Sequence, residues 1–257
     1  MRRNAVDLDR FYASRQGRTA QTMIMRRLEA LWPDVRDLDM LGLGFTTPFL
    51  ERYQASARRC LSFLPAGQGA VISGETAPPS AMGDETRLPF MDAIFDRILV
   101  VHALEEADSL RPLLREIWRV MAPGGRMVIV TSARAGVWAH MDATPFGHGR
   151  PFSRGQLTQL LHDALFEPAA WSRALYAPPW RWSTWPRLAQ AWEKAGETAW
   201  PGLGGVILVE AVKRNAALTP RDRKPGIRRR ALEGAPAGAL SPRHKDQDRS
   251  TEEDDLQ

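Results

Sequence analysis

The sequence has little of what a disulfide-bonded, metal-binding or membrane-spanning protein needs. It holds one cysteine, Cys60, in 257 residues, which excludes an intrachain disulfide framework and a thiolate metal site. Its longest apolar runs, such as 98–101 and 127–130, fall far short of the ~20 residues that cross a bilayer. The first ten residues are rich in Arg and Asp and offer no apolar stretch of the kind that a secretory signal requires. We therefore predict a cytoplasmic protein with no metal and no membrane span.

The sequence also lacks a concentrated basic patch. Its formal net charge is +5 and its pI is near 9.9, but the basic residues are scattered along helices or lie in a mixed-sign C-terminal segment. No nucleic-acid recognition motif accompanies them, so we expect no specific nucleic-acid partner. Hydrophobic residues make up 44% of the chain, which is ordinary for one large or two small packed α/β domains.

After Arg214 the composition changes. The chain becomes rich in proline, glycine, alanine and charge, and its apolar residues are isolated. Such a segment buries too little apolar surface to offset the entropy of ordering it. Its basic block at 228–230 and its acidic block at 252–255 have opposite signs, as in a solvated tail. We therefore predict an ordered domain over 1–214 and a disordered charged tail over 215–257.

Apolar periodicity divides the predicted domain into helices and strands. Leading helices are predicted within 1–36, and further helices from Pro48 onward and over 109–121 and 154–164. Ser153 and Gln156 form the capping-box pattern at the start of the last of these. Strands are predicted at 38–44, 59–64, 69–73, 95–101, 126–131, 170–176 and 205–212, with a loop over 74–80. Continuous apolar strands separated by helices indicate a parallel sheet covered by helices on both faces.

A tryptophan-rich stretch joins the last two predicted strands. Trp185, Leu188, Trp192 and Ala199 lie on one helical stripe, which favours a helix that packs against the sheet. Two alternatives stay open, because tryptophan beside arginine also suits an interface: a lid over an acceptor pocket, or a face for peripheral contact with a membrane. The other aromatic and basic residues of the stretch are Trp180, Arg181, Trp182, Arg187 and Trp200.

The turn formed by Gly42, Leu43 and Gly44 lies between a predicted strand and a predicted helix. Glycine there lets the backbone approach a ligand closely, although a tight turn without a ligand is as good an explanation of these residues alone. More specific is the order of the motifs that follow along the chain. They are Gly83-Asp84-Glu85-Thr86-Arg87-Leu88-Pro89-Phe90, the strand start Phe95-Asp96-Arg97, His102-Ala103-Leu104-Glu105-Glu106, and Ala122-Pro123-Gly124-Gly125 before another strand.

This succession, from about Asp37 to Val130, resembles the class I S-adenosylmethionine-dependent methyltransferases of the type 11 group. The resemblance implies a Rossmann-like α/β fold: a mostly parallel seven-stranded sheet with helices on both faces and an antiparallel last strand. It also implies S-adenosylmethionine as the cofactor. In such a protein Gly42 and Gly44 contact the amino-acid and ribose portion of the cofactor, Asp84 and the backbone of Glu85 contact its adenine, and His102 faces it.

Two departures from the family pattern concern the cofactor site. Phe45 crowds the glycine loop, where the family has a third small residue. The second strand of the family ends in an acid that holds the ribose hydroxyls, but residues 60–68 contain none. Gln68 is the candidate substitute, and exchanging an acid for a neutral partner weakens binding by roughly 10- to 100-fold.

The loop after the strand at 126–131 carries the candidates for the acceptor side. We predict His148 as the catalytic base, Arg150 as an anion contact and Trp138 as a further substrate contact. The leading hypothesis is a methyltransferase that acts on a small or lipid-like acceptor. The alternative is a catalytically inactive binding or regulatory protein on the same fold. A nicotinamide dehydrogenase fits poorly, because no G-x-G-x-x-G follows the first strand and no Tyr-x-x-x-Lys pair occurs.

Overall fold

The computed structural model describes residues 3–71, 74, 77–180 and 185–214, apart from the side chains of Pro186 and Arg187. The described residues belong to one compact unit, Met1–Ala216. The predicted tail over 215–257 lies outside the described residues, as do Arg181 and Trp182 of the tryptophan-rich stretch. Within the described residues, no helix is both long enough and apolar enough to cross a membrane.

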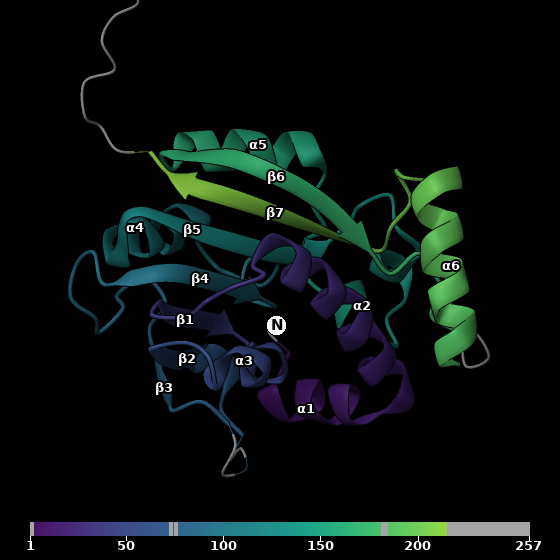
Figure 1. The fold of residues 1–257 in the computed structure, drawn as a ribbon, viewed down its shortest axis with the longest axis horizontal. Helices are drawn as coiled ribbons and strands as arrows, with labels where there is room; N and C mark the ends of the chain where they lie inside the picture. The colour runs from purple at the N-terminus through teal and green to yellow at the C-terminus, as the bar shows by residue number, and fades with distance from the viewer. Residues whose placement is uncertain (1–2, 72–73, 75–76, 181–184, 215–257) are drawn as a thin grey trace, which may run out of the picture. The chain divides into compact units, whose positions relative to one another are not determined.

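A seven-stranded sheet forms the centre of this unit, in the order β3-β2-β1-β4-β5-β7-β6 (Figure 1). Neighbours from β3 to β5 pair in parallel, and β7 is antiparallel to both β5 and β6. The predicted mostly parallel sheet with an antiparallel last strand is thus confirmed. The strands are β1 Asp39–Gly44, β2 Arg59–Pro65, β3 Ser80–Gly83, β4 Phe95–Val101, β5 Met121–Ser132, β6 Phe166–Ala174 and β7 Val206–Lys213.

Helices cover both faces of the sheet, as predicted. One apolar core joins α1, α2 and α3 to alternate strand residues such as Met40 and Val101, and a second core joins α4 and α5 to the intervening residues, such as Leu41 and Val100. The central strands are therefore apolar on both sides, which explains why their sequences are continuous rather than alternating. The helices are α1 Ala5–Ala13, α2 Arg15–Leu31, α3 Thr47–Gln54, α4 Leu110–Val120, α5 Arg154–Asp163 and α6 Pro186–Ala199.

Local signals set several of these boundaries. Ser14 ends α1 and caps α2, because its hydroxyl accepts the N–H of Gly17 at 3.0 Å. The predicted capping box of α5 is confirmed, since the Ser153 hydroxyl accepts the Gln156 N–H and the Gln156 side chain accepts the Ser153 N–H. Pro48 lies in the first turn of α3, where its missing N–H costs no helical hydrogen bond.

The third strand was predicted at the wrong place. Residues 69–71 of the predicted strand are not in a strand, and the third strand is β3, which begins at the last residue of the predicted loop. The strand β3 is four residues long and pairs only with β2 at the sheet edge. An edge strand with exposed residues needs no apolar run, so periodicity carries little signal for it.

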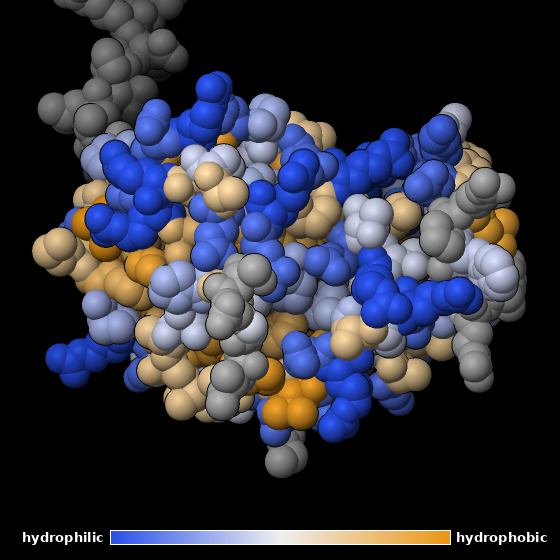
Figure 2. Space-filling view, turned by 60° about the horizontal axis from the view of Figure 1, so that its bottom comes forward, coloured by the Kyte–Doolittle hydropathy of each residue, from blue (hydrophilic) through white to orange (hydrophobic). Residues whose placement is uncertain are grey.

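The favoured interpretation of the tryptophan stripe was also wrong. Helix α6 buries Ala189, Glu193 and Gly196, whereas Trp185 is 59% exposed and Leu188 is 38% exposed. A Cβ at Gly196 would overlap the Tyr176 ring, so the helix packs through its small residues. Orange residues lie among paler and blue ones at the right of Figure 2, the side on which Figure 1 places α6. Trp185, Leu188 and Ala199 of the stripe therefore face solvent, whereas Trp192 is half-buried, and the lid and membrane-face alternatives both stay open.

Candidate cofactor site at the carboxyl ends of the strands

The candidate site lies where the strand order reverses, between β1 and β4. In open α/β sheets, ligands bind in the crevice outside the carboxyl ends of the strands at such a point. Gly44 ends β1, Gln68 lies in the turn after β2, and His102 follows β4. The Gln68 Nε2 donates to the His102 carbonyl oxygen at 3.0 Å, so the structure brings predicted cofactor residues from distant parts of the sequence together.

Both predicted glycines have a packing reason within the chain. Gly44 has a φ of +86°, and a Cβ there would overlap the carbonyl oxygen of Val101. The next residue, Phe45, donates its N–H to that same oxygen at 3.0 Å, so the turn is held against β4. A Cβ at Gly42 would overlap the Thr46 side chain at the start of α3. The contacts of Gly42 and Gly44 with a cofactor stay predictions.

Aromatic side chains cover this crevice. The Tyr12 hydroxyl, from α1, lies 2.8 Å from His102 Nε2, and the Tyr12 ring stacks on Phe45 with centroids 5.8 Å apart. The centroid of the Phe146 ring lies 4.8 Å from that of the His102 ring. All four residues are buried. In this conformation the chain's own rings therefore fill the space above the ends of β1 and β4.

Burial controls the protonation of this cluster. It lowers the pKa of His102 to about 3, with a further contribution from the positive charge of Arg3, so the imidazole is neutral near pH 7. A neutral imidazole can accept the Tyr12 O–H at Nε2. Burial, followed by the nearby charge of Glu105, raises the pKa of Tyr12 well above its ordinary value. The pair is therefore an uncharged hydrogen bond that links α1 to the end of β4.

Glu105 is a second buried titratable group at this edge. Its Oε1 accepts the N–H of Ser132 at 3.1 Å. Burial raises the pKa of this carboxyl to about 7, because its effect exceeds the lowering by the hydrogen bond from the Ser132 N–H. The carboxyl therefore keeps its proton to a higher pH than an exposed glutamate does.

Gln68 carries one of the buried polar atoms near the strand ends that have no partner among the described residues; Glu105 Oε2 and Thr131 Oγ1 are others. The Gln68 side chain is 2% exposed, and its Oε1 makes no hydrogen bond within the described part of the chain. Buried acceptors are normally paired, so an unpaired one marks a place for a donor. The atom follows the end of β2, where the resemblance puts the acid that holds the ribose. The residues present therefore fit the hydroxyl groups of an adenosyl cofactor, with Gln68 as the residue that would hold them.

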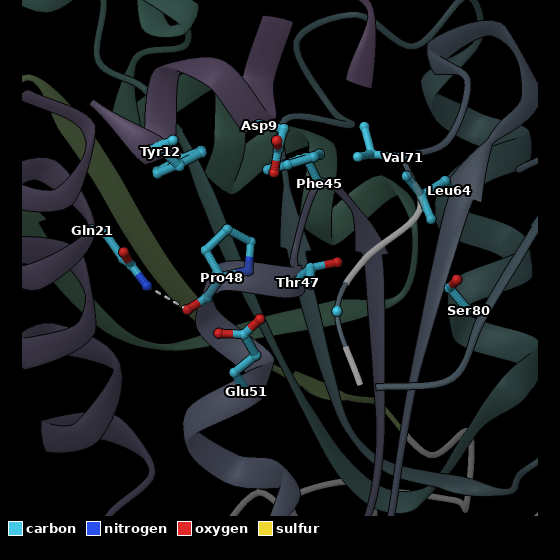
Figure 3. Close-up of a pocket in the computed structure, with 12 residues that line it drawn as sticks. Asp9, Tyr12, Gln21, Phe45, Thr47, Pro48, Glu51, Leu64, Val71 and Ser80 are labelled. Atoms are coloured by element: carbon cyan, nitrogen blue, oxygen red, sulfur yellow. Dashed lines mark hydrogen bonds between the residues drawn. The ribbon is translucent and has the colours of Figure 1, made fainter. Parts of the chain in front are cut away.

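An open cavity lies beside the filled crevice. It has a volume of about 380 Å³, which lies within the range of small-molecule pockets, and Tyr12 and Phe45 belong to its lining (Figure 3). Asp9 of α1, Glu51 of α3 and Leu64 of β2 also line it. Tyr12 and Phe45 therefore separate this cavity from His102 at the end of β4.

Asp84 and Glu85 follow β3 at the sheet edge. The Asp84 Oδ1 accepts the N–H of Thr86 at 2.8 Å and its hydroxyl at 2.7 Å, which is the pattern of a side chain that closes its own turn. Glu85 is buried. Neither residue lines the cavity beside Tyr12. The predicted contacts of both residues with adenine stay predictions.

The candidates for the acceptor side lie in the loop after β5. His148 Nε2 lies against the Arg3 guanidinium and 2.8 Å from the Asp142 carbonyl oxygen. The Arg150 guanidinium donates to the Ala107 carbonyl at 2.5 Å. Trp138 is buried, and its indole N–H donates to the Ala177 carbonyl oxygen at 2.7 Å. Each of the three has a partner within the chain, and their roles toward a substrate stay predictions.

Tyr12 and Glu105 are site residues that the sequence reasoning did not single out. Tyr12 belongs to a helix that periodicity predicts but whose position over the sheet it does not give. Glu105 belongs to the motif that begins at His102. An acidic side chain soon after a core strand could have marked it as a candidate site residue.

Comparison with known proteins shows what the part of the chain that carries this site is similar to. Residues 44–129 match the model of a methyltransferase domain. A demethylmenaquinone methyltransferase from Streptomyces avermitilis is 34% identical over 142 residues, which cover 50% of this chain and 54% of the relative. A protein of the same name from Streptomyces griseus is 34% identical over 149 residues, which cover 53% of this chain and 58% of the relative. The chain thus spans little more than half the length of these curated relatives.

A solved structure agrees with the fold. The crystal structure of an S-adenosylmethionine-dependent methyltransferase from Thermotoga maritima has a TM-score of 0.61 and 18% identity, and the match covers 81% of this chain and 95% of that one. At this identity the likeness concerns the fold alone. Residues 44–129, whose match begins at the glycine that ends β1, are thus similar to the methyltransferase domain family, and the chain shares the fold of this S-adenosylmethionine-dependent methyltransferase.

Proposed function

We propose that this chain is a methyltransferase that uses S-adenosylmethionine to methylate a small or lipid-like acceptor. One observation carries the proposal: Gly44, Gln68 and His102 meet at the carboxyl ends of β1, β2 and β4, where this fold binds ligands. The buried, unpaired Gln68 Oε1 supports it, because it offers an acceptor to a hydroxyl-bearing ligand.

The cofactor would supply a methyl group already activated by its sulfonium. The chain then has to align the acceptor in line with that group and exclude water. Tyr12, Phe45 and Phe146 supply an apolar wall for this purpose. Where the acceptor must lose a proton, His148 is the proposed base once its Nε2 is released from Arg3.

We propose a quinol-like ring as the acceptor. The relatives from both Streptomyces species are named for methylating demethylmenaquinone. The aromatic side chains at the crevice and the exposed tryptophans of α6 are consistent with a flat, lipophilic acceptor. Contact with a lipid surface through α6 belongs to this proposal.

The test is methyl transfer from tritiated S-adenosylmethionine to a short-chain demethylmenaquinol in detergent. We expect label in the extracted quinol and heat of binding for S-adenosylhomocysteine in calorimetry. Binding without transfer would leave the cofactor assignment intact and reject this acceptor. Absence of both would reject the enzyme.

A second candidate is a catalytically inactive binding protein on the same fold. Two observations favour it: the rings of Tyr12 and Phe45 occupy the crevice, and the turn after β2 carries Gln68 in place of an acid. Unmodified protein that shows neither heat nor thermal shift with millimolar S-adenosylmethionine would decide for this candidate.

A further inference from the structure

The Gln68 side-chain amide has a hydrogen-bonded nitrogen and an unpaired oxygen. Its Nε2 donates to the His102 carbonyl oxygen at 3.0 Å, and its Oε1 is buried without a partner within the described residues. The oxygen and nitrogen of an amide are attached to the same planar carbon, so a hydrogen bond at the nitrogen fixes where the oxygen lies. The His102 carbonyl therefore determines which way the Gln68 acceptor points.

The position of this carbonyl depends on an unusual backbone. His102 has a φ of +52°, in the left-handed region that residues other than glycine rarely adopt. Such a conformation persists only where its surroundings hold it, and here the side chain contacts Tyr12 and Phe146. The bond from Gln68 is thus part of a buried chain of contacts that runs from α1 to the turn after β2.

We propose that Gln68 recognises the ribose hydroxyls of the cofactor as a neutral acceptor, with the His102 carbonyl as the positioning group. This inference rests on the proposed function. It names a specific chemistry for the site: a carboxamide oxygen, fixed by a backbone carbonyl, accepts a hydroxyl where the family pattern has an acid.

The arrangement makes glutamate a poor substitute at position 68. A carboxylate has no N–H to donate, so one of its oxygens would face the His102 carbonyl oxygen across the present 3.0 Å contact. Two acceptors at that distance repel each other, and the side chain would turn away from its present orientation. Gln68→Glu therefore weakens cofactor binding, although it restores the residue type of the family.

The experiment is calorimetry of the full chain with S-adenosylhomocysteine and with its 2′-deoxy and 3′-deoxy analogues. Gln68→Met keeps the length of the side chain and removes the acceptor. We expect Gln68→Met and Gln68→Glu each to bind S-adenosylhomocysteine at least tenfold more weakly than the unmodified chain. Removing a ribose hydroxyl from the ligand lowers its affinity for the unmodified chain. We expect this factor to be at least fivefold smaller for Gln68→Met.

The matched control is Gln16→Glu. Gln16 also donates its Nε2 to a carbonyl oxygen, that of Pro179 at 2.9 Å, but it is not one of the predicted cofactor residues. We expect Gln16→Glu to bind S-adenosylhomocysteine with the affinity of the unmodified chain. The melting temperature of each variant is measured alongside, and the hydroxyl discrimination is a readout that a loss of stability alone does not move.

Two outcomes overturn the inference. In the first, Gln68→Met loses as much affinity as the unmodified chain does when a ribose hydroxyl is removed from S-adenosylhomocysteine. In the second, Gln68→Glu binds S-adenosylhomocysteine more tightly than the unmodified chain does. Either leaves the proposed function standing as long as the unmodified chain binds S-adenosylhomocysteine. An unmodified chain that does not bind it overturns both.

Discussion

Gly44 and Gly124 share a left-handed backbone but differ in what surrounds them. Their φ angles are +86° and +74°. A Cβ at Gly44 would overlap the Val101 carbonyl oxygen and crowd Ala103, whereas a Cβ at Gly124 would meet nothing within 4 Å. The pair therefore separates the cost of the backbone angle from the cost of packing.

We predict that Gly44→Ala lowers the free energy of unfolding by about 3 kcal/mol or more, because overlap adds to backbone strain. Gly124→Ala should cost about 1 kcal/mol, from strain alone. Urea unfolding of both variants measures the difference, and equal losses would contradict the packing argument. A bulkier residue at Gly44 is consequently a test of folding rather than of cofactor binding.

Glu105 gives a prediction about pH. Its pKa in the fold is about 7, above the ordinary 4.5, so between these values the folded state binds more protons than the unfolded state. The contribution of this group to the free energy of unfolding therefore falls as pH rises from about 4.5 to 7. Glu105→Gln should raise stability at pH 8 by up to about 3 kcal/mol and change it little at pH 4.5.

Unfolding by urea at the two pH values checks this. Glu193 also has a pKa raised to about 7, mainly by burial, so the variant keeps that part of the pH dependence. An effect of Glu105→Gln that is the same at both pH values would contradict the burial argument.

At the residue scale, the sequence predicted which residues lie near one another at the site better than it predicted the contacts that each residue makes. Gly44 and His102 were named from motif order and Gln68 as the substitute for the missing acid; Gln68 donates to the His102 carbonyl, and Gly44 packs against Val101 and Ala103, the neighbours of His102. Tyr12 was not named, since its place depends on how α1 lies across the strand ends. Trp138 was named from its loop, but its burial depends on contacts with Gly205 before β7 and with Ala177 after β6, which no local pattern encodes.

At the scale of elements, the strands whose two faces are both buried were the ones that the sequence predicted well. The strand β4 was predicted with its observed bounds, and β1 and β2 to within one residue, because both faces of these strands are covered. Edge strand β3 carried no such signal. The periodicity of α6 gave its helical form correctly but not its orientation, since an apolar stripe does not say whether core or solvent lies beyond it.

The exposed face of α6 leads to a prediction about lipid surfaces. Trp185 is 59% exposed, and the guanidinium of Arg15 lies 4.9 Å from the centre of its ring. Tryptophan beside a cation suits the interface of an anionic membrane. We expect the chain to sediment with anionic vesicles, and the double variant Trp185→Ser, Leu188→Ser to do so several-fold less.

Met91→Gln is the control for this experiment. Met91 is 76% exposed and precedes β4 at the amino end of the strands. Its replacement should leave sedimentation unchanged. An equal loss in both variants would show non-specific adhesion rather than docking through α6.

At the scale of the whole molecule, the cores that we describe are complete by the end of β7. The apolar residues of both cores lie between Ala5 and Ala211. We predict that deleting residues 218–257 shifts the melting temperature by about 2 °C or less, because their composition offers little apolar surface to bury. Differential scanning calorimetry of the shortened chain tests this, and a large drop would show that these residues contribute to stability.

The Tyr12 ring over the crevice has a consequence for measured affinities. If a ligand can enter only when α1 carries this ring away, then just the open fraction of molecules is competent to bind. The apparent dissociation constant is the intrinsic one divided by that fraction, so an open population of about one in a hundred raises it about a hundredfold. By the same linkage, a bound ligand shifts the population of α1 positions, and mobility of the N-terminal helix becomes a reporter of occupancy.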